Sequence, residues 1–198
     1  ILMDTPINKP ALLRQTFELG ASYSGELLSL NKMLGSLQDA GNTVTLAGYI
    51  NLLNESGLLC GLQKFSIDNA RRKASIPKLQ VYNNALKMVY NSSSFEQSLI
   101  DRKHWGRIFD SGIGAYLVSQ AFTHRFEVYY WRERNDEVDF ILRKNNSLIA
   151  IEVKSNAEKN TSGLDKFRQN FNPDKAFIVG EGGITPEEFL SMNIKKLF

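Results

Sequence analysis

Cysteine and histidine are scarce in this 198-residue chain, which limits the chemistry open to it. Cys60 is the only cysteine, so a disulfide within the chain is excluded and a reducing compartment is expected. Together with His104 and His124 it supplies too few ligands for a Cys/His zinc cluster. Zinc fingers and disulfide-stabilised scaffolds are therefore excluded.

Long apolar runs are also absent. No segment approaches the roughly 20 apolar residues that span a bilayer. The start, Ile1-Leu2-Met3-Asp4, lacks the basic residues and the long apolar stretch of a signal peptide. We therefore expect a cytoplasmic protein without a membrane partner, and the missing initiator methionine indicates a fragment.

Charge is nearly balanced, with a formal net charge of +3. This value is compatible with a polyanionic partner, although a soluble protein with a few extra lysines explains it equally well. Hydrophobic residues make up 42% and charged residues 23%, a balance that favours a globular chain over a disordered one. The length suits one ordinary domain or two small ones.

Helical periodicity dominates the first 60 residues. We expect helices from Pro10, from Leu27 to about Leu37, and from Thr43 to about Glu55. Two strand-like segments, 58–65 and 78–82, follow and are joined by the loop 68–75. Three helices followed by a two-stranded ribbon is the order of a winged helix, so residues 1–90 are predicted to form a winged-helix domain.

The loop of this ribbon is basic. In a winged helix it would be the wing, and Arg71, Arg72 and Lys73 are candidates for contact with a nucleic-acid backbone. The third helix, which would enter a groove, has no Arg or Lys between Thr43 and Glu55. A packing or protein–protein module with a solvated loop is therefore an open alternative.

The second half, residues 91–198, changes to a mixed pattern. We expect a helix at 105–122, strands at 127–132, 137–143 and 147–154, a helix at 163–170 and a strand at 176–179. The order αβββαβ predicts a mixed sheet, so the whole chain is assigned to the α/β (α+β) class.

Two neighbouring strands of this half carry the chemistry, in Glu137-Val138-Asp139 and Ile151-Glu152-Val153-Lys154. Alternate side chains on a strand share a face, so Glu152 and Lys154 point the same way and Asp139 can converge on them. Two carboxylates offer the hard oxygen ligands of Mg²⁺ or Mn²⁺, and an ammonium can stabilise charge on a phosphate. The alternative is an exposed ion pair between Glu152 and Lys154.

This order of elements resembles the PD-(D/E)XK, or restriction-endonuclease-like, superfamily. Almost the whole chain is similar to the C-terminal region of bacterial and archaeal AAA-type ATPases that carry the domain of unknown function 4143. The stretches that carry the resemblance are Leu34–Leu59, Gly106-Arg107-Ile108-Phe109-Asp110, Tyr130-Trp131-Arg132 and Glu137-Val138-Asp139-Phe140. The resemblance implies a winged helix followed by a nuclease-like domain at residues 91–198, with an N-terminal AAA ATPase domain of the same protein as partner. No Gly-x-x-x-x-Gly-Lys-Ser/Thr occurs in the sequence, so ATP binding by that motif is not expected here.

The resemblance also assigns roles. Asp139, Glu152 and Lys154 fall on the metal and lysine positions of the superfamily, and Asp110 stands where relatives often have a glutamate ligand. From its place before the Asp139 strand, Arg132 is a candidate phosphate contact.

The leading hypothesis is a nucleic-acid-associated module, with DNA as the favoured partner and with Mg²⁺-dependent phosphodiester hydrolysis. The alternative is a degenerate nuclease fold that binds DNA or protein as a specificity module. A third hypothesis, a partner in a toxin–antitoxin or mobile-element system, is one that no residue addresses.

Overall fold

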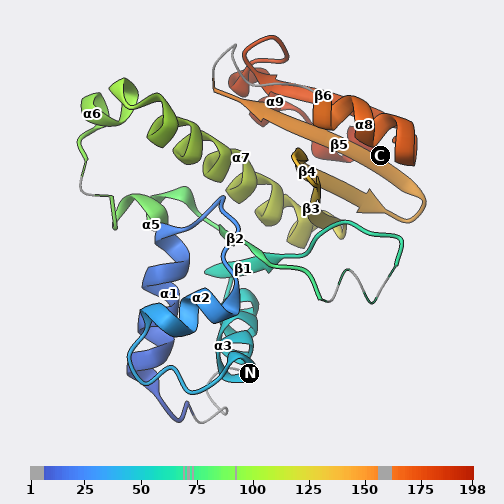
Figure 1. Cartoon of the computed structure of the whole chain (residues 1–198). Helices are drawn as coiled ribbons and strands as arrows, with labels where there is room; N and C mark the ends of the chain where they lie inside the picture. The colour runs from blue at the N-terminus through green and yellow to red at the C-terminus, as the bar shows by residue number, and fades with distance from the viewer. Residues whose placement is uncertain (1–6, 69, 71, 73, 92, 156–161) are drawn as a thin grey trace.

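A computed structural model describes residues 7–68, 70, 72, 74–91, 93–155 and 162–198. Its helices and strands follow in the order α1 (Pro10–Ser22), α2 (Leu30–Ser36), α3 (Thr43–Glu55), β1 (Leu59–Leu62), β2 (Lys78–Val81), α5 (Asn84–Met88), α6 (Phe95–Ile100), α7 (Arg102–His124), β3 (Glu127–Glu133), β4 (Asp136–Lys144), β5 (Ser147–Lys154), α8 (Ser162–Phe171), β6 (Lys175–Gly180), α9 (Pro186–Ser191) and the 3₁₀ helix η2 (Ile194–Leu197). Figure 1 shows the N-terminal helices on one side of α7 and the larger sheet on the other. Within the described ranges, no helix combines the length and the apolar character needed to cross a membrane.

The larger sheet has the strand order β3-β4-β5-β6. Its first three strands are antiparallel, whereas β6 runs parallel to β5. A parallel pair needs a crossover, which α8 supplies. Asn145 takes a positive φ of 53° in the turn between β4 and β5, where the sequence predicts a tight turn. The mixed α/β class is confirmed.

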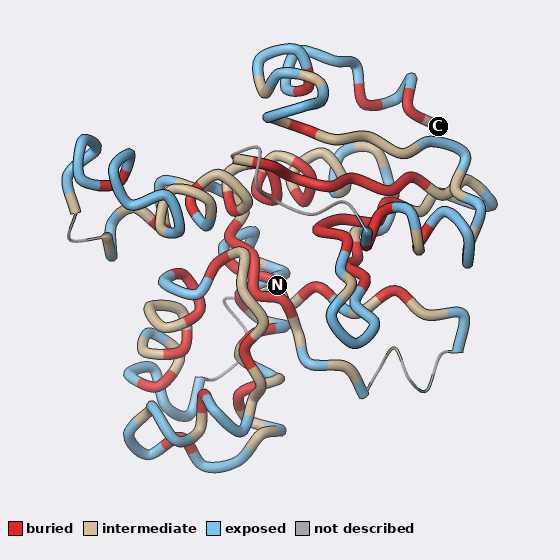
Figure 2. Tube along the Cα trace, turned by 45° about the horizontal axis from the view of Figure 1, so that its top comes forward, coloured by how far each residue is buried: buried red, intermediate tan, exposed pale blue. Residues whose placement is uncertain are grey.

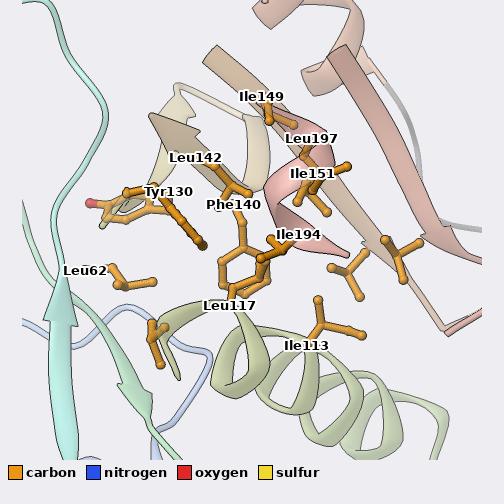
Figure 3. Close-up of a cluster of buried hydrophobic side chains, with 14 of the residues drawn as sticks. Leu62, Ile113, Leu117, Tyr130, Phe140, Leu142, Ile149, Ile151, Ile194 and Leu197 are labelled. Atoms are coloured by element: carbon orange, nitrogen blue, oxygen red, sulfur yellow. The ribbon is translucent and has the colours of Figure 1, made fainter. Parts of the chain in front are cut away.

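Both faces of this sheet are covered. On one face Ile113 and Leu117 of α7 pack with Phe140 and Ile151 of the central strands, as Figure 3 shows. On the other face Phe167 of α8 belongs to a second apolar cluster. Strands that are buried on both sides read as nearly continuous apolar runs, and β4 and β5 do so.

The β1–β2 ribbon is likewise buried on two sides. Leu59, Leu79 and Val81 pack with the N-terminal helices, whereas Cys60 and Leu62 belong to the cluster of α7 and the larger sheet. Figure 2 shows buried residues in both halves of the molecule. The ribbon is therefore the place where the core of one half meets the core of the other.

The first half differs from the sequence expectations at α2 and α5, and its strand β1 ends at Leu62 and not at residue 65. Helix α2 starts at Leu30 and not at Leu27, because Leu27 forms a β-bridge with Lys78 and the side chain of Ser29 caps the helix. A helix that the periodicity did not indicate, α5, begins after Asn83, whose side chain accepts a hydrogen bond from the backbone N–H of Ala85. In both cases a single capping side chain decides where the helix begins.

The glycines of α7 do not interrupt it. The helix starts at Arg102, because the carboxylate of Asp101 accepts from the backbone N–H groups of Lys103 and His104. A Cβ at Gly114 would overlap the side chains of Gln80 and Phe140. The missing side chain of Gly114 thus lets residues of β2 and β4 both contact the helix.

We predict that Gly163→Ala lowers the free energy of unfolding by about 1–3 kcal/mol, as overpacking does. A Cβ at Gly163 would overlap the backbone of Glu137, so α8 would have to move off β4. Gly48→Ala is the matched control, because no atom lies within 4 Å of its added Cβ and Gly48 is an exposed position of α3. It should stabilise by about 0.5–1 kcal/mol through helix propensity. Urea unfolding measures both, and equal effects would contradict the packing argument.

Candidate functional site

A β-bulge positions Asp139. Tyr129 pairs with Ile141 and Trp131 pairs with Val138, so Tyr130 alone opposes two residues of β4, Asp139 and Phe140. A bulge leaves one residue outside the ladder and redirects the side chains around it. As a result Val138 and Ile141, three residues apart, both face α8.

The carboxylate of Asp139 lies beside the backbone of β5, which carries Glu152 and Lys154 and is called the Glu-x-Lys strand below. Its Oδ2 accepts a hydrogen bond of 2.9 Å from the backbone N–H of Val153, the peptide that joins Glu152 to Val153. Asp139 is buried, with 5% of its surface exposed. The structure therefore brings the aspartate and the Glu-x-Lys strand together at the level of the backbone.

Glu152 and Lys154 are buried, with 1% and 8% of their surfaces exposed. Ile151 and Val153 pack in the cluster that contains α7, as expected. Alternation along β5 then puts Glu152 and Lys154 on the other face, the face on which Ala150 packs under α8. Their burial excludes the alternative of an exposed surface ion pair.

Lys78 is the site residue that the sequence analysis missed. Its Nζ lies 3.6 Å from Oδ1 of Asp139, and both side chains are more than nine-tenths buried. The same Nζ donates to the backbone oxygen of Asp139 at 3.2 Å and lies 4.4 Å from the centre of the Phe140 ring. The signal was present in the strand 78–82, because the alternation that buries Leu79 and Val81 on one face puts Lys78 on the other.

The other polar residue on that face of β2 anchors the ribbon to α7. The side-chain amide of Gln80 donates to the backbone oxygen of Ser111 at 2.9 Å. The hydroxyl of Ser111 in turn hydrogen-bonds the hydroxyl of Ser24 at 2.8 Å. These contacts fix the turn of α7 next to Asp110 against the N-terminal half.

Asp110 and Asp139 line one cavity of about 280 Å³ between the two halves. Other charged residues of its lining are Glu26, Lys78, Arg132 and Glu137. Glu152 and Lys154 are not among the residues that line it. The cavity therefore joins three residues of the predicted set, Asp110, Asp139 and Arg132.

The donor chemistry of this cavity fits a hydrated Mg²⁺. In the part of the chain that the structure describes, no group of three or more His, Cys, Asp or Glu could hold a metal ion. Mg²⁺, however, commonly uses one or two carboxylates and keeps several waters. Asp110 and Asp139 both line the cavity and offer carboxylate oxygens of this kind, with the ammonium of Lys78 as a competitor for Asp139.

The four residues that were predicted to contact nucleic acid do not lie together at one described surface. Arg132 is exposed and also lines a second cavity, of about 960 Å³, which carries Lys64 and Arg134. The guanidinium of Arg72 donates to the Tyr129 hydroxyl at 3.4 Å and lies over that ring. Arg71 and Lys73 lie outside the described residues.

Cys60 takes no part in the site. Complete burial raises the pKa of its thiol to about 12, so the thiol stays protonated at neutral pH. A protonated thiol is a poor nucleophile, and Cys60 is also buried, so we assign it a packing role.

Two family models match the chain, one in each half. Residues 105–189 match the domain of unknown function 4143, and residues 1–94 match the domain of unknown function 8612. The resemblance to the 4143 domain is thus supported for the second half, whereas the stretch Leu34–Leu59 falls in the other match. Neither the curated proteins nor the solved structures contain a match to the chain.

We predict that Asp139→Asn destabilises the protein by about 3–5 kcal/mol, the cost of leaving a buried charge without its counter-ion. The amide retains an oxygen for the Val153 N–H, so the change removes the charge opposite Lys78 and little else. In the double variant Asp139→Asn/Lys78→Met, the loss should be smaller than the sum of the two single losses by more than about 1 kcal/mol. Urea unfolding of the four proteins measures this coupling, and strictly additive losses would show that the pair is not coupled.

Proposed function

We propose that this chain is the nuclease-like, nucleic-acid-associated module of an AAA-type ATPase, acting in the cytoplasm by Mg²⁺-dependent phosphodiester hydrolysis. One observation carries the proposal: Asp110 and Asp139 border one cavity, and Asp139 is hydrogen-bonded to the backbone of the Glu-x-Lys strand. The order α7-β3-β4-β5-α8-β6 and the match to the 4143 domain support it. The ATPase rests on the resemblance described above.

The domain organisation belongs to the same proposal. Residues 1–90 would form a winged helix, in which α3 and the β1–β2 ribbon have the expected order, and residues 91–198 would form the restriction-endonuclease-like domain. The ribbon then joins the two, since its two faces belong to two different cores.

In this proposal Asp139 and Asp110 would hold Mg²⁺ or Mn²⁺ in the cavity, and Glu152, the other predicted ligand, would have to turn toward it, because Glu152 does not line the cavity. The bound ion would lower the pKa of a water and polarise a phosphoryl oxygen. Lys154, which does not line the cavity either, would have to extend toward it to stabilise the negative charge that develops on the phosphate. Arg132, exposed at the edge of the cavity, would contact a neighbouring phosphate and position the nucleic acid.

A second function is favoured by a different observation. The carboxylate of Asp139 faces a buried ammonium, and Glu152 and Lys154 are also buried. This arrangement supports a nuclease fold that binds DNA or protein as a specificity module without hydrolysing it. The exposed Arg132 and Arg134 beside the larger cavity would then carry the binding.

We predict that the purified chain cleaves DNA or RNA in the presence of Mg²⁺ or Mn²⁺, and that Lys154→Ala lowers the rate by about 100-fold or more, the usual effect of losing a group that stabilises transition-state charge. Labelled single-stranded, duplex and branched substrates should be compared on denaturing gels. Lys175→Met is the control, because Lys175 is exposed and lies at the opposite end of the β5–β6 pair.

An absence of cleavage on every substrate, with either metal, would contradict the hydrolytic function. Nucleic-acid binding, measured by fluorescence anisotropy, then decides whether the specificity module binds DNA or protein. Arg132→Ala should weaken binding to a nucleic acid and reduce its dependence on salt concentration, if the chain is a specificity module for nucleic acids.

A further inference from the structure

The bulge in β4 forms a receptor for a cation. Because Asp139 and Phe140 together oppose Tyr130, one residue of the bulge is left out of the regular ladder. The backbone oxygen of Asp139 accepts from Nζ of Lys78, and the ring of Phe140 lies under the same ammonium. Carbonyl oxygen, carboxylate and aromatic face are three groups that attract positive charge.

Both carboxylate oxygens of Asp139 are engaged. Oδ2 accepts from the Val153 N–H, and Oδ1 faces Lys78 at 3.6 Å. A divalent cation in the cavity would need one of these oxygens. The partner of Oδ2 is a backbone amide of the sheet, whereas the partner of Oδ1 is a lysine side chain, which can change its rotamer. Lys78 and the metal would therefore compete for the same atom.

We infer that Lys78 is a positioning residue of the proposed site, which competes with a divalent cation for Asp139 and so sets the metal affinity. The inference rests on the proposed function, since it concerns the same carboxylate. Lys78 belongs to the N-terminal half, where its strand pairs with β1 and forms a bridge to Leu27. The metal affinity of a site in one half is thereby controlled by a residue of the other half.

Electrostatics gives the direction of the effect. An ammonium next to Oδ1 satisfies the carboxylate and repels a second cation, so its removal should favour metal binding. A lysine that served only to hold the halves together would give the opposite result, because its loss would loosen the cavity and weaken any metal site there.

The test is Mn²⁺ binding to the 198-residue chain, measured by isothermal titration calorimetry at fixed pH and salt. Lys78→Met should bind Mn²⁺ at least about tenfold more tightly than the unmodified chain, since a neighbouring charge commonly changes ionic equilibria by that factor or more. Lys78→Arg, which keeps the charge, and the distant Lys175→Met should bind as the unmodified chain does. Adding Asp139→Asn to Lys78→Met should abolish the gain.

A second variant guards against loss of the fold. Lys78→Gln removes the charge but keeps a donor for the backbone oxygen of Asp139, and it should show the same gain in affinity. If neither the Met nor the Gln variant binds Mn²⁺ more tightly, the inference is overturned, even where the unmodified chain binds Mn²⁺ and cleaves nucleic acid. If affinity rises but no variant cleaves, the inference holds and the hydrolytic function fails.

Discussion

Asp139 makes contacts that join three strands of the protein, β2, β4 and β5. It receives the Val153 N–H of β5, it belongs to the bulge of β4, and it faces the ammonium of Lys78 on β2. A buried carboxylate is stable only with such partners, because the loss of hydration must be offset by hydrogen bonds and opposite charge. The relative position of β2 and the larger sheet is therefore tied to one side chain.

Further buried polar contacts lie near this junction, beginning within the N-terminal half. The ammonium of Lys87 donates to the backbone oxygen of Ser24 at 2.7 Å, and burial lowers the pKa of this lysine. Gln80 and Ser111 extend these contacts to α7. Buried hydrogen bonds are directional, so they restrict the arrangement of the elements that they join. The cavity between the halves thus has walls held by directional bonds, which a site for an ion or a phosphate requires.

Much of this fold could be predicted from local signals. The αβββαβ order, the turn at Asn145 and the start of α3 after Asn42 follow from periodicity, turn residues and caps that lie within a few residues of one another. The bulge could not be predicted, because it depends on how β3 and β4 pair and not on β4 alone. The partner of Lys78 could not be predicted either, since Asp139 is 61 residues further along the chain. Asp139, Glu152 and Lys154 were found from their pattern, but their roles in metal binding and catalysis stay predictions.

The ion pair of Lys78 and Asp139 is hard to explain by stability alone. Two apolar side chains of similar volume would commonly serve as well or better, because burying two charges costs more than an imperfect pair returns. The pair is imperfect, since 3.6 Å is longer than a strong charge-assisted hydrogen bond of about 2.8 Å, and Nζ directs its shorter contact to the backbone oxygen of Asp139. Asp139 is thus buried, bonded to the strand of Glu152 and paired with its lysine at a distance longer than the strongest ion pairs show. Under the proposed function, this geometry would suit an exchange between the ammonium of Lys78 and a divalent cation at Asp139.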